Sequence, residues 1–200
     1  MFQIRIHGRG GQGVVSASEL LAVAAFEEGK YSQSFPSFGS ERMGAPVQAF
    51  ARISDTNITI REPVMEPDML IIQDPTLFQA VNVFEGANTE GYLLINSSKT
   101  VEELGIDDIT SKYPKNHVMV LPATELAVKY IKQPKPNTVL LGAFAALSHM
   151  VKIPALEKAI RGKFTKRIAE PNIIATTAGY NFIMKLLLQQ EQQEELAQGD

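Results

Sequence analysis

Three glycines near the amino terminus have a spacing that suits the binding of a phosphate group. Gly8, Gly10 and Gly13 satisfy the pattern G-x-G-x-x-G. A glycine loop of this kind lets the main chain turn tightly and approach a ligand closely. When a helix follows such a loop, its first N–H groups have no partner inside the helix and attract negative charge. Arg9 lies within the loop and can donate further hydrogen bonds to the same anion.

The glycines alone do not identify the ligand. Dinucleotide-binding proteins carry an acidic residue roughly 20 positions further on, which binds the ribose, whereas residues 30–40 contain neither Asp nor Glu. The loop also lacks the G-K-[ST] ending of nucleoside triphosphatases, because Val14 follows Gly13. A conventional NAD site and a P-loop are therefore disfavoured. A tight strand–helix turn that binds no ligand is the alternative interpretation.

A second polar group, formed by Ser40, Glu41 and Arg42, lies between Gly39 and Gly44 in a long connection. Loops of this length often carry binding residues. These side chains can contact a phosphate or a partner protein. They can equally form a solvated turn or an ion pair that holds the loop, and the sequence does not decide between these interpretations.

Signals for other kinds of chemistry are missing from the sequence. The three histidines, His7, His117 and His149, have no metal-binding spacing, and the G-x-S-x-G pattern of hydrolases does not occur. The chain contains no cysteine, which excludes a thiolate nucleophile, a disulfide and a cysteine-ligated iron–sulfur cluster. The residues therefore predict an anion-binding protein with no catalytic residue and no metal ligand of its own.

The glycine loop is expected to lie between a strand over residues 2–7 and a helix over residues 14–28. Further strands are predicted at residues 47–53, 58–60, 68–74, 92–96 and 117–121, and helices at residues 75–81, 124–132, 137–150, 154–163 and 171–189. Turn residues at 54–57 make the first two of these strands an inserted β-hairpin. Strands that alternate with helices predict a three-layer α/β fold. We expect a mostly parallel sheet, a Rossmann-like glycine loop and a helical C-terminal part.

The composition is typical of a soluble globular protein. The 200 residues, 44% of them hydrophobic, fit a single α/β domain over residues 1–190 and a polar tail over residues 191–200. The formal net charge of −3 gives no overall attraction to nucleic acid or to an anionic membrane. No apolar stretch approaches the ~20 residues of a membrane span, and no secretory signal is visible. We expect a cytoplasmic protein that binds neither nucleic acid nor membrane.

Four blocks of the sequence resemble the gamma subunits of 2-oxoacid:ferredoxin oxidoreductases, nearest the pyruvate type. They are residues 4–14 (IRIHGRGGQGV), 29–47 (GKYSQSFPSFGSERMGAPV), 66–77 (EPDMLIIQDPTL) and 137–143 (NTVLLGA). The blocks occur in the same order as in that family and are spread over nearly the whole chain. The first two blocks together are specific, whereas the first alone is a weak signal.

The resemblance implies a subunit without a complete active site, in an enzyme that converts a 2-oxoacid and coenzyme A into acyl-CoA and CO2 and reduces ferredoxin. It implies that thiamine diphosphate, Mg and 4Fe-4S clusters lie on partner alpha, beta and delta subunits, which agrees with the absence of cysteine here. Coenzyme A carries a pyrophosphate and a 3′-phosphate, so a glycine loop without a ribose-binding acid suits it. The residues expected near coenzyme A are Gly8, Arg9, Gly10, Gly11, Gln12 and Gly13, with Ser40, Glu41 and Arg42 at the ligand or at a subunit interface.

One position departs from the pattern of that family. Met43 stands where many relatives carry arginine, so Arg42 is the single guanidinium before Gly44. The role of a second guanidinium in coenzyme A contact is therefore open, as are the 2-oxoacid, the direction of the reaction and the oligomeric state. A stand-alone nucleotide-binding regulatory module and a scaffold subunit that binds no ligand are the alternative functions.

Overall fold

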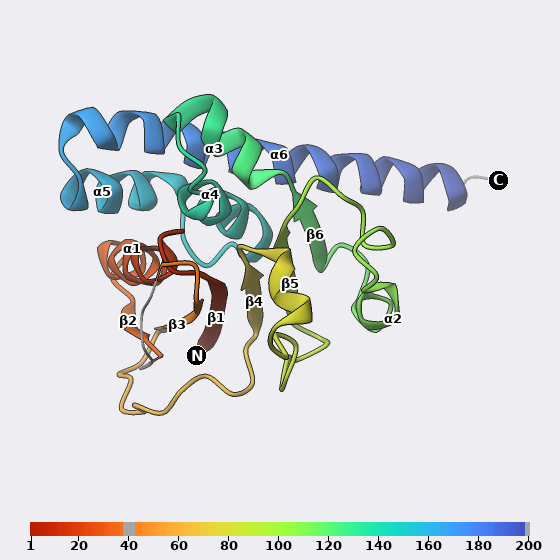
Figure 1. The fold of residues 1–200 in the computed structure, drawn as a ribbon, viewed down its shortest axis with the longest axis horizontal. Coiled ribbons are helices and arrows are strands. Elements are labelled where there is room, and N and C mark those ends of the chain that lie inside the picture. The colour runs from red at the N-terminus through yellow and green to blue at the C-terminus, as the bar shows by residue number, and fades with distance from the viewer. Residues whose placement is uncertain (38–42, 199–200) are drawn as a thin grey trace.

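The structure is a computed structural model that describes residues 1–37 and 43–198. These residues form a six-stranded sheet in the order β2-β3-β1-β4-β5-β6 (Figure 1). The strands are β1 (Phe2–Arg9), β2 (Tyr31–Pro36), β3 (Pro46–Ser54), β4 (Met69–Ile72), β5 (Tyr92–Asn96) and β6 (Val118–Leu121). β1, β4, β5 and β6 are parallel, whereas β3 is antiparallel to both of its neighbours, β1 and β2. The mostly parallel sheet predicted from the sequence is confirmed.

Helices of unequal size cover the two faces of the sheet. The larger ones are α1 (Val14–Glu27), α3 (Ala123–Ile131), α4 (Asn137–Ser148), α5 (Ile153–Lys163) and α6 (Lys166–Gln198). α1 and α4 pack on the sheet, and α6 lies over α4 on the outside (Figure 1). In the described part of the chain, the opposite face carries the short helices η1 (Pro75–Gln79) and α2 (Asp107–Thr110) together with loops. The α/β class and the helical C-terminal part are therefore confirmed.

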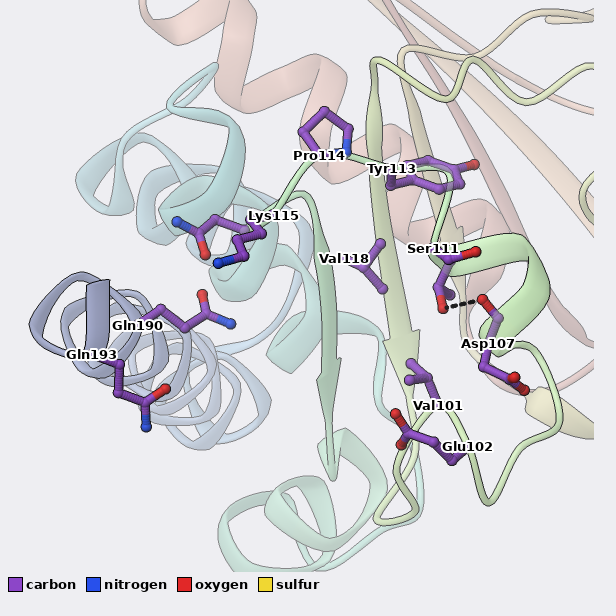
Figure 2. A pocket seen from close by; sticks show the side chains of 12 residues that line it. Val101, Glu102, Asp107, Ser111, Tyr113, Pro114, Lys115, Val118, Gln190 and Gln193 are labelled. Carbon is purple, nitrogen blue, oxygen red and sulfur yellow. Dashed lines mark hydrogen bonds between the residues drawn. The ribbon is translucent and has the colours of Figure 1, made fainter. Parts of the chain in front are cut away.

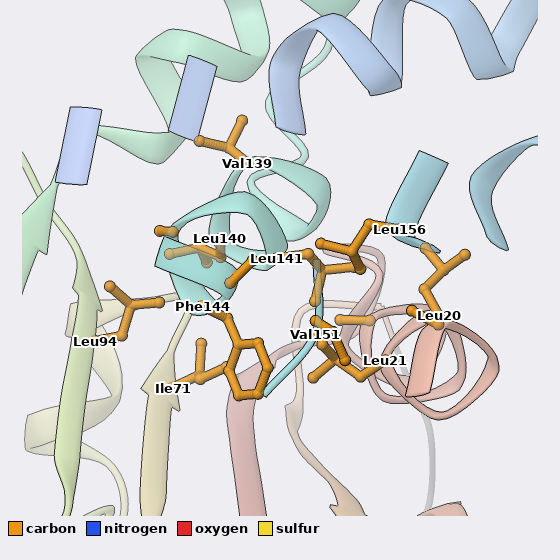
Figure 3. Packing of buried hydrophobic residues seen from close by; sticks show 14 of the residues in the cluster. Leu20, Leu21, Ile71, Leu94, Val139, Leu140, Leu141, Phe144, Val151 and Leu156 are labelled. Carbon is orange, nitrogen blue, oxygen red and sulfur yellow. The ribbon is translucent and has the colours of Figure 1, made fainter. Parts of the chain in front are cut away.

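The main core lies between the sheet and α4. Alternation along the strands sends Ile71 of β4 and Leu94 of β5 toward α4, where they meet Leu140 and Phe144 (Figure 3). Every residue of α4 is buried, because the sheet covers one side of this helix and α6 covers the other. A helix that is enclosed in this way must be apolar around its whole circumference, which explains its Ala- and Leu-rich sequence.

The inserted antiparallel pair has a different partner from the one predicted. Residues 47–53 do form a strand, but β3 pairs with β2 on one side and with β1 on the other, and residues 58–60 form no strand. Both edges of β3 are thus occupied. The β2–β3 pair is also held by an aromatic contact between Phe35 and Phe50, with ring centroids 5.2 Å apart. The three residues Ile58, Thr59 and Ile60 offer no comparable packing.

The last helix, α6, continues to Gln198, so residues 191–198 belong to this helix. Figure 1 shows the carboxyl-terminal part of α6 running past β6 and beyond the sheet. In the described part of the chain, no helix is long and apolar enough to cross a membrane. The division into a domain over residues 1–190 and a separate tail stays a prediction.

Candidate functional site at the glycine loop

The glycine loop lies where the chain leaves neighbouring parallel strands in opposite directions. From β1 the chain passes through α1 to the β2 edge of the sheet, whereas from β4 it passes through η1 to β5. The carboxyl ends of the adjacent strands β1 and β4 therefore form a topological switch point. Open α/β sheets bind ligands in the crevice at such a point. The position of the loop in the fold thus supports a binding site, independently of its glycine pattern.

Close contacts and positive φ angles explain why glycine is needed in this loop. Gly11 and Gly13 have φ angles of 95° and 77°, which side chains other than glycine rarely adopt. A Cβ atom on Gly8 would lie 2.5 Å from Cγ2 of Val14. α1 follows directly, and no side chain caps its amino terminus. The first N–H groups of α1 are therefore available to an anion.

A network of polar side chains connects the glycine loop with Asp74 and Thr76, which follow β4. The main-chain N–H of Arg9 donates to Oε1 of Gln12 (2.8 Å), and Nε2 of Gln12 donates to Oδ2 of Asp74 (2.9 Å). The Arg9 guanidinium donates to Oγ1 of Thr76 (2.7 Å), and its Nε lies 3.3 Å from Oδ2 of Asp74. Arg9 and Gln12 thus have a structural role, and their predicted contact with a ligand stays a prediction.

The charge of Asp74 is stabilised by the same network. Burial is the largest single influence and raises the pKa of this carboxyl, but the hydrogen bonds from Thr76 and Gln12 and the charge of Arg9 together outweigh it. As a result, the pKa of Asp74 lies below its ordinary value. Asp74 therefore remains ionised and holds both Arg9 and Gln12 in place.

Two cavities flank the amino terminus of α1 and share Gly11, Gly13 and Ser16. One has a volume of about 400 Å³ and is also lined by Arg9, Gly10, Val14, Val15, Met43 and Val47. The other has a volume of about 490 Å³ and extends toward the start of α4 and of α6. Together they form a concave surface with the glycine loop at the place where they meet.

Two cations line the larger cavity, and sequence reasoning connected neither with the loop. Lys135 lies in the connection from α3 to α4, and Arg167 lies in the first turn of α6. Asn137, the first residue of α4, faces the loop directly, because a Cβ atom on Gly13 would lie 2.5 Å from its Nδ2. These residues are separated from the glycines by more than 100 positions, so only the fold brings them together. The positive charges of Lys135 and Arg167 favour an anionic ligand.

The main chain of Met43, Gly44 and Ala45 contacts the glycine loop. Ser40, Glu41 and Arg42 lie outside the described residues. The segment that follows them returns to the glycine loop: the N–H of Gly10 donates to the carbonyl of Ala45 (2.9 Å), and the N–H of Gly44 donates to the carbonyl of Gly10 (3.1 Å). The assignment of Ser40, Glu41 and Arg42 to a ligand or to a subunit interface stays a prediction.

A buried amide beside the loop was also missed by sequence reasoning. Gln73 follows β4 and is 1% exposed, and its Cβ lies 3.2 Å from the position of a Cβ on Gly8. Within the described residues, neither polar atom of its side chain has a hydrogen-bond partner. A buried amide without hydrogen-bond partners destabilises the folded state, and an ordered water or a ligand commonly supplies the missing hydrogen bonds.

His7 gives the folded protein a pH-dependent stability. Burial, assisted by the charge of Arg5, lowers the pKa of His7 from 6.5 to about 3. The unfolded chain therefore binds a proton below pH 6.5 that the folded chain does not bind, and stability is lost as the pH falls toward 3. At pH 5 this loss is about 2 kcal/mol relative to pH 7.

The His7→Gln variant tests this assignment, because it keeps a polar side chain and removes the titrating group. Urea unfolding at several pH values is expected to show the wild-type loss between pH 6.5 and 5, and a flatter profile for the variant. An unchanged slope in His7→Gln would show that another group causes the loss.

The fold and the loop define a class: Rossmann-like α/β proteins with a glycine loop at a topological switch point. The chain matches the family "Pyruvate ferredoxin/flavodoxin oxidoreductase" over residues 3–182. A curated relative, pyruvate synthase subunit PorC of Methanocaldococcus jannaschii, is 43% identical over 185 residues, covering 92% of this chain and 98% of the relative.

The fold also matches solved structures. Pyruvate oxidoreductase subunit PORC of Thermotoga maritima is 39% identical and superposes with a TM-score of 0.75, covering 90% of this chain and 95% of that one. A 2-oxoglutarate:ferredoxin oxidoreductase of Magnetococcus marinus, solved with 2-oxoglutarate, coenzyme A and succinyl-CoA bound, is 19% identical with a TM-score of 0.68. It covers 92% of this chain and 31% of that one, and shows the fold alone.

The chain therefore belongs to the pyruvate ferredoxin/flavodoxin oxidoreductase family, as a subunit of the gamma type. The resemblance seen in the four sequence blocks is confirmed. As a member of this family, the protein is one subunit of an oxidoreductase complex.

Proposed function

We propose that this subunit binds coenzyme A along the two cavities at the amino terminus of α1. In this proposal it assembles with alpha, beta and delta subunits that carry thiamine diphosphate, Mg and 4Fe-4S clusters. The complex converts a 2-oxoacid, of which pyruvate is the first to test, and coenzyme A into acyl-CoA and CO2 and passes electrons to ferredoxin. This chain positions coenzyme A and provides no reacting group.

The observation that carries the proposal is the convergence of three features on one surface. The uncapped amino terminus of α1 offers N–H donors, the glycines let a phosphate approach, and Lys135 and Arg167 add positive charge across the larger cavity. Coenzyme A is long and carries phosphates at two places. It therefore suits a surface with two cavities better than a compact ligand does.

The residues of this chain fit the proposed division of labour. The sequence has no cysteine for a cluster, and residues 1–37 and 43–198 contain no group of three His, Asp or Glu side chains that could hold a metal ion. The proposal places metal and redox chemistry on the partners. The coenzyme A in the structure of the Magnetococcus marinus relative supports testing this ligand first.

The variant Gly10→Asp tests the ligand. Gly10 lines the smaller cavity and, unlike Gly11 and Gly13, does not have a positive φ, so a side chain is compatible with its backbone. A carboxylate there is expected to repel the phosphates and to raise the KM for coenzyme A at least tenfold in the assembled enzyme.

Gly10→Ala is the matched control, because it adds a methyl group without charge and is expected to change this KM much less. The KM for the 2-oxoacid should stay constant in both variants. If Gly10→Asp leaves coenzyme A affinity unchanged in an assembled and active enzyme, the loop does not bind the phosphates. The scaffold alternative would then be favoured.

A further inference from the structure

A groove far from the glycine loop follows the outer edge of the sheet. It has a volume of about 640 Å³ and lies beside β6, the last strand of the sheet. Figure 2 shows Gln190 and Gln193 of α6 on one side of the groove, and Glu102 and Asp107 on the other. Val118, the first residue of β6, lies between these two walls. The groove therefore straddles the strand edge.

The main chain of β6 offers hydrogen-bonding groups to this groove. The carbonyls of His117 and Leu121 accept bonds from the β5 side of the sheet. Because the two sides of a strand alternate, the N–H and C=O groups of Val118 and Val120 point away from β5. An open edge of this kind is a template for another strand, and proteins cover such edges or use them for binding.

The wall contributed by α6 lies beyond the residues that the family model matches. The family match ends at residue 182, whereas α6 continues to Gln198. In this added part, Oε1 of Gln190 is buried and has no hydrogen-bond partner among the described residues. A buried acceptor of this kind requires a donor from water or from a bound molecule.

The charge around the groove indicates the chemistry of its occupant. Glu102 and Asp107 line it. Lys115 also lines the groove but already has an interaction within the chain. A segment with lysine or arginine side chains is complementary to this surface.

We propose that the groove binds an extended, basic segment of a sister subunit, which adds to β6 as a further strand. Main-chain hydrogen bonds to Val118 and Val120 supply the pairing, and the wall with Glu102 and Asp107 selects the basic segment. The added part of α6 covers the docked strand on one side. The proposal rests on the assembly of this chain into a complex, but not on the binding of coenzyme A.

Amide hydrogen exchange on the assembled complex tests this pairing. In the isolated chain the N–H groups of Val118 and Val120 are expected to exchange rapidly, because they face the open edge. In the complex they are expected to exchange at least tenfold more slowly. Equal rates in the isolated chain and in the complex would overturn the proposal. Protection in the isolated chain that grows with its concentration would also overturn it, because a second copy would then be the occupant.

The pair Val118→Pro and Val118→Thr separates pairing from packing. Proline removes the outward N–H and is tolerated on edge strands, whereas threonine keeps the N–H and a similar shape. Val118→Pro is expected to weaken binding of the sister subunits about tenfold, and Val118→Thr to leave it nearly unchanged. Equal binding by both variants would contradict strand addition.

A salt series tests the charge, and coenzyme A titration separates this proposal from the previous one. The charge-reversing variant Glu102→Lys is expected to weaken binding of the sister subunits, and this loss of affinity should shrink as the ionic strength rises. A loss of affinity that does not depend on salt would exclude charge selection.

Complexes that contain Val118→Pro should bind coenzyme A normally once assembled. Failure of coenzyme A binding in every complex would refute the proposed function but would not contradict strand addition at the groove.

Discussion

The substitution Gly142→Ala is expected to destabilise the protein by about 3 kcal/mol or more. A Cβ atom on Gly142 of α4 would lie 1.8 Å from the main-chain carbonyl oxygen of Thr176 in α6. That oxygen belongs to a helix backbone and cannot rotate away as a side chain would. α4 and α6 must therefore separate, which disturbs packing along their whole contact.

The position of α4 makes this separation costly. The helix is buried along its full length and contacts both the sheet and α6, so it cannot shift without opening the main core. Gly179 makes the reciprocal approach from α6, because its Cβ would lie 2.0 Å from the carbonyl oxygen of Val139. Gly179→Ala is expected to destabilise to a similar degree.

The control is Gly162→Ala in α5, where a Cβ atom would meet nothing within 4 Å. Inside a helix, alanine is more favourable than glycine by roughly 0.5–1 kcal/mol. This variant is therefore expected to be slightly more stable than the wild type. Urea unfolding of the three alanine variants measures the difference. If Gly142→Ala and Gly162→Ala had the same stability, the close helix contact would not exist in solution.

The parts of the fold that sequence reasoning predicted are those with strong local signals. The apolar runs at residues 69–72 and 93–95 are buried on both faces, and only a central strand places them so. The glycines of residues 8–13 were recognised because their spacing reflects local backbone geometry. Such features are encoded within about ten neighbouring residues.

The features that were missed depend on contacts between distant segments. The pairing of β2 with β3 could not be read from residues 31–36, because a short polar strand resembles a loop until its partner is known. The sequence did not connect Lys135 and Arg167 with the glycine loop, since the fold alone brings them there. In the same way, the sequence predicts a strand at β6 but not that it forms the edge of the sheet.

The double variant Lys135→Ala/Arg167→Ala is expected to raise the dissociation constant for coenzyme A about 100-fold or more in the assembled enzyme. Each side chain lines the larger cavity, and a hydrogen bond to a charged group contributes about 1.5 kcal/mol at the low end of its range. Lys166→Ala is the matched control for charge. Lys166 neighbours Arg167 on α6, does not line the cavity, and should affect the dissociation constant little.

Dephospho-coenzyme A, which lacks the 3′-phosphate, identifies the phosphate that these cations bind. The amino terminus of α1 suits the pyrophosphate, because N–H donors there are held at fixed positions by the glycine loop. The cations across the larger cavity then remain for the 3′-phosphate. The wild type is therefore expected to bind dephospho-coenzyme A more weakly than coenzyme A, and the double variant to bind both equally. If the variant still distinguishes the two ligands, Lys135 and Arg167 of the wild type contact the pyrophosphate, and coenzyme A lies in the opposite orientation along the two cavities.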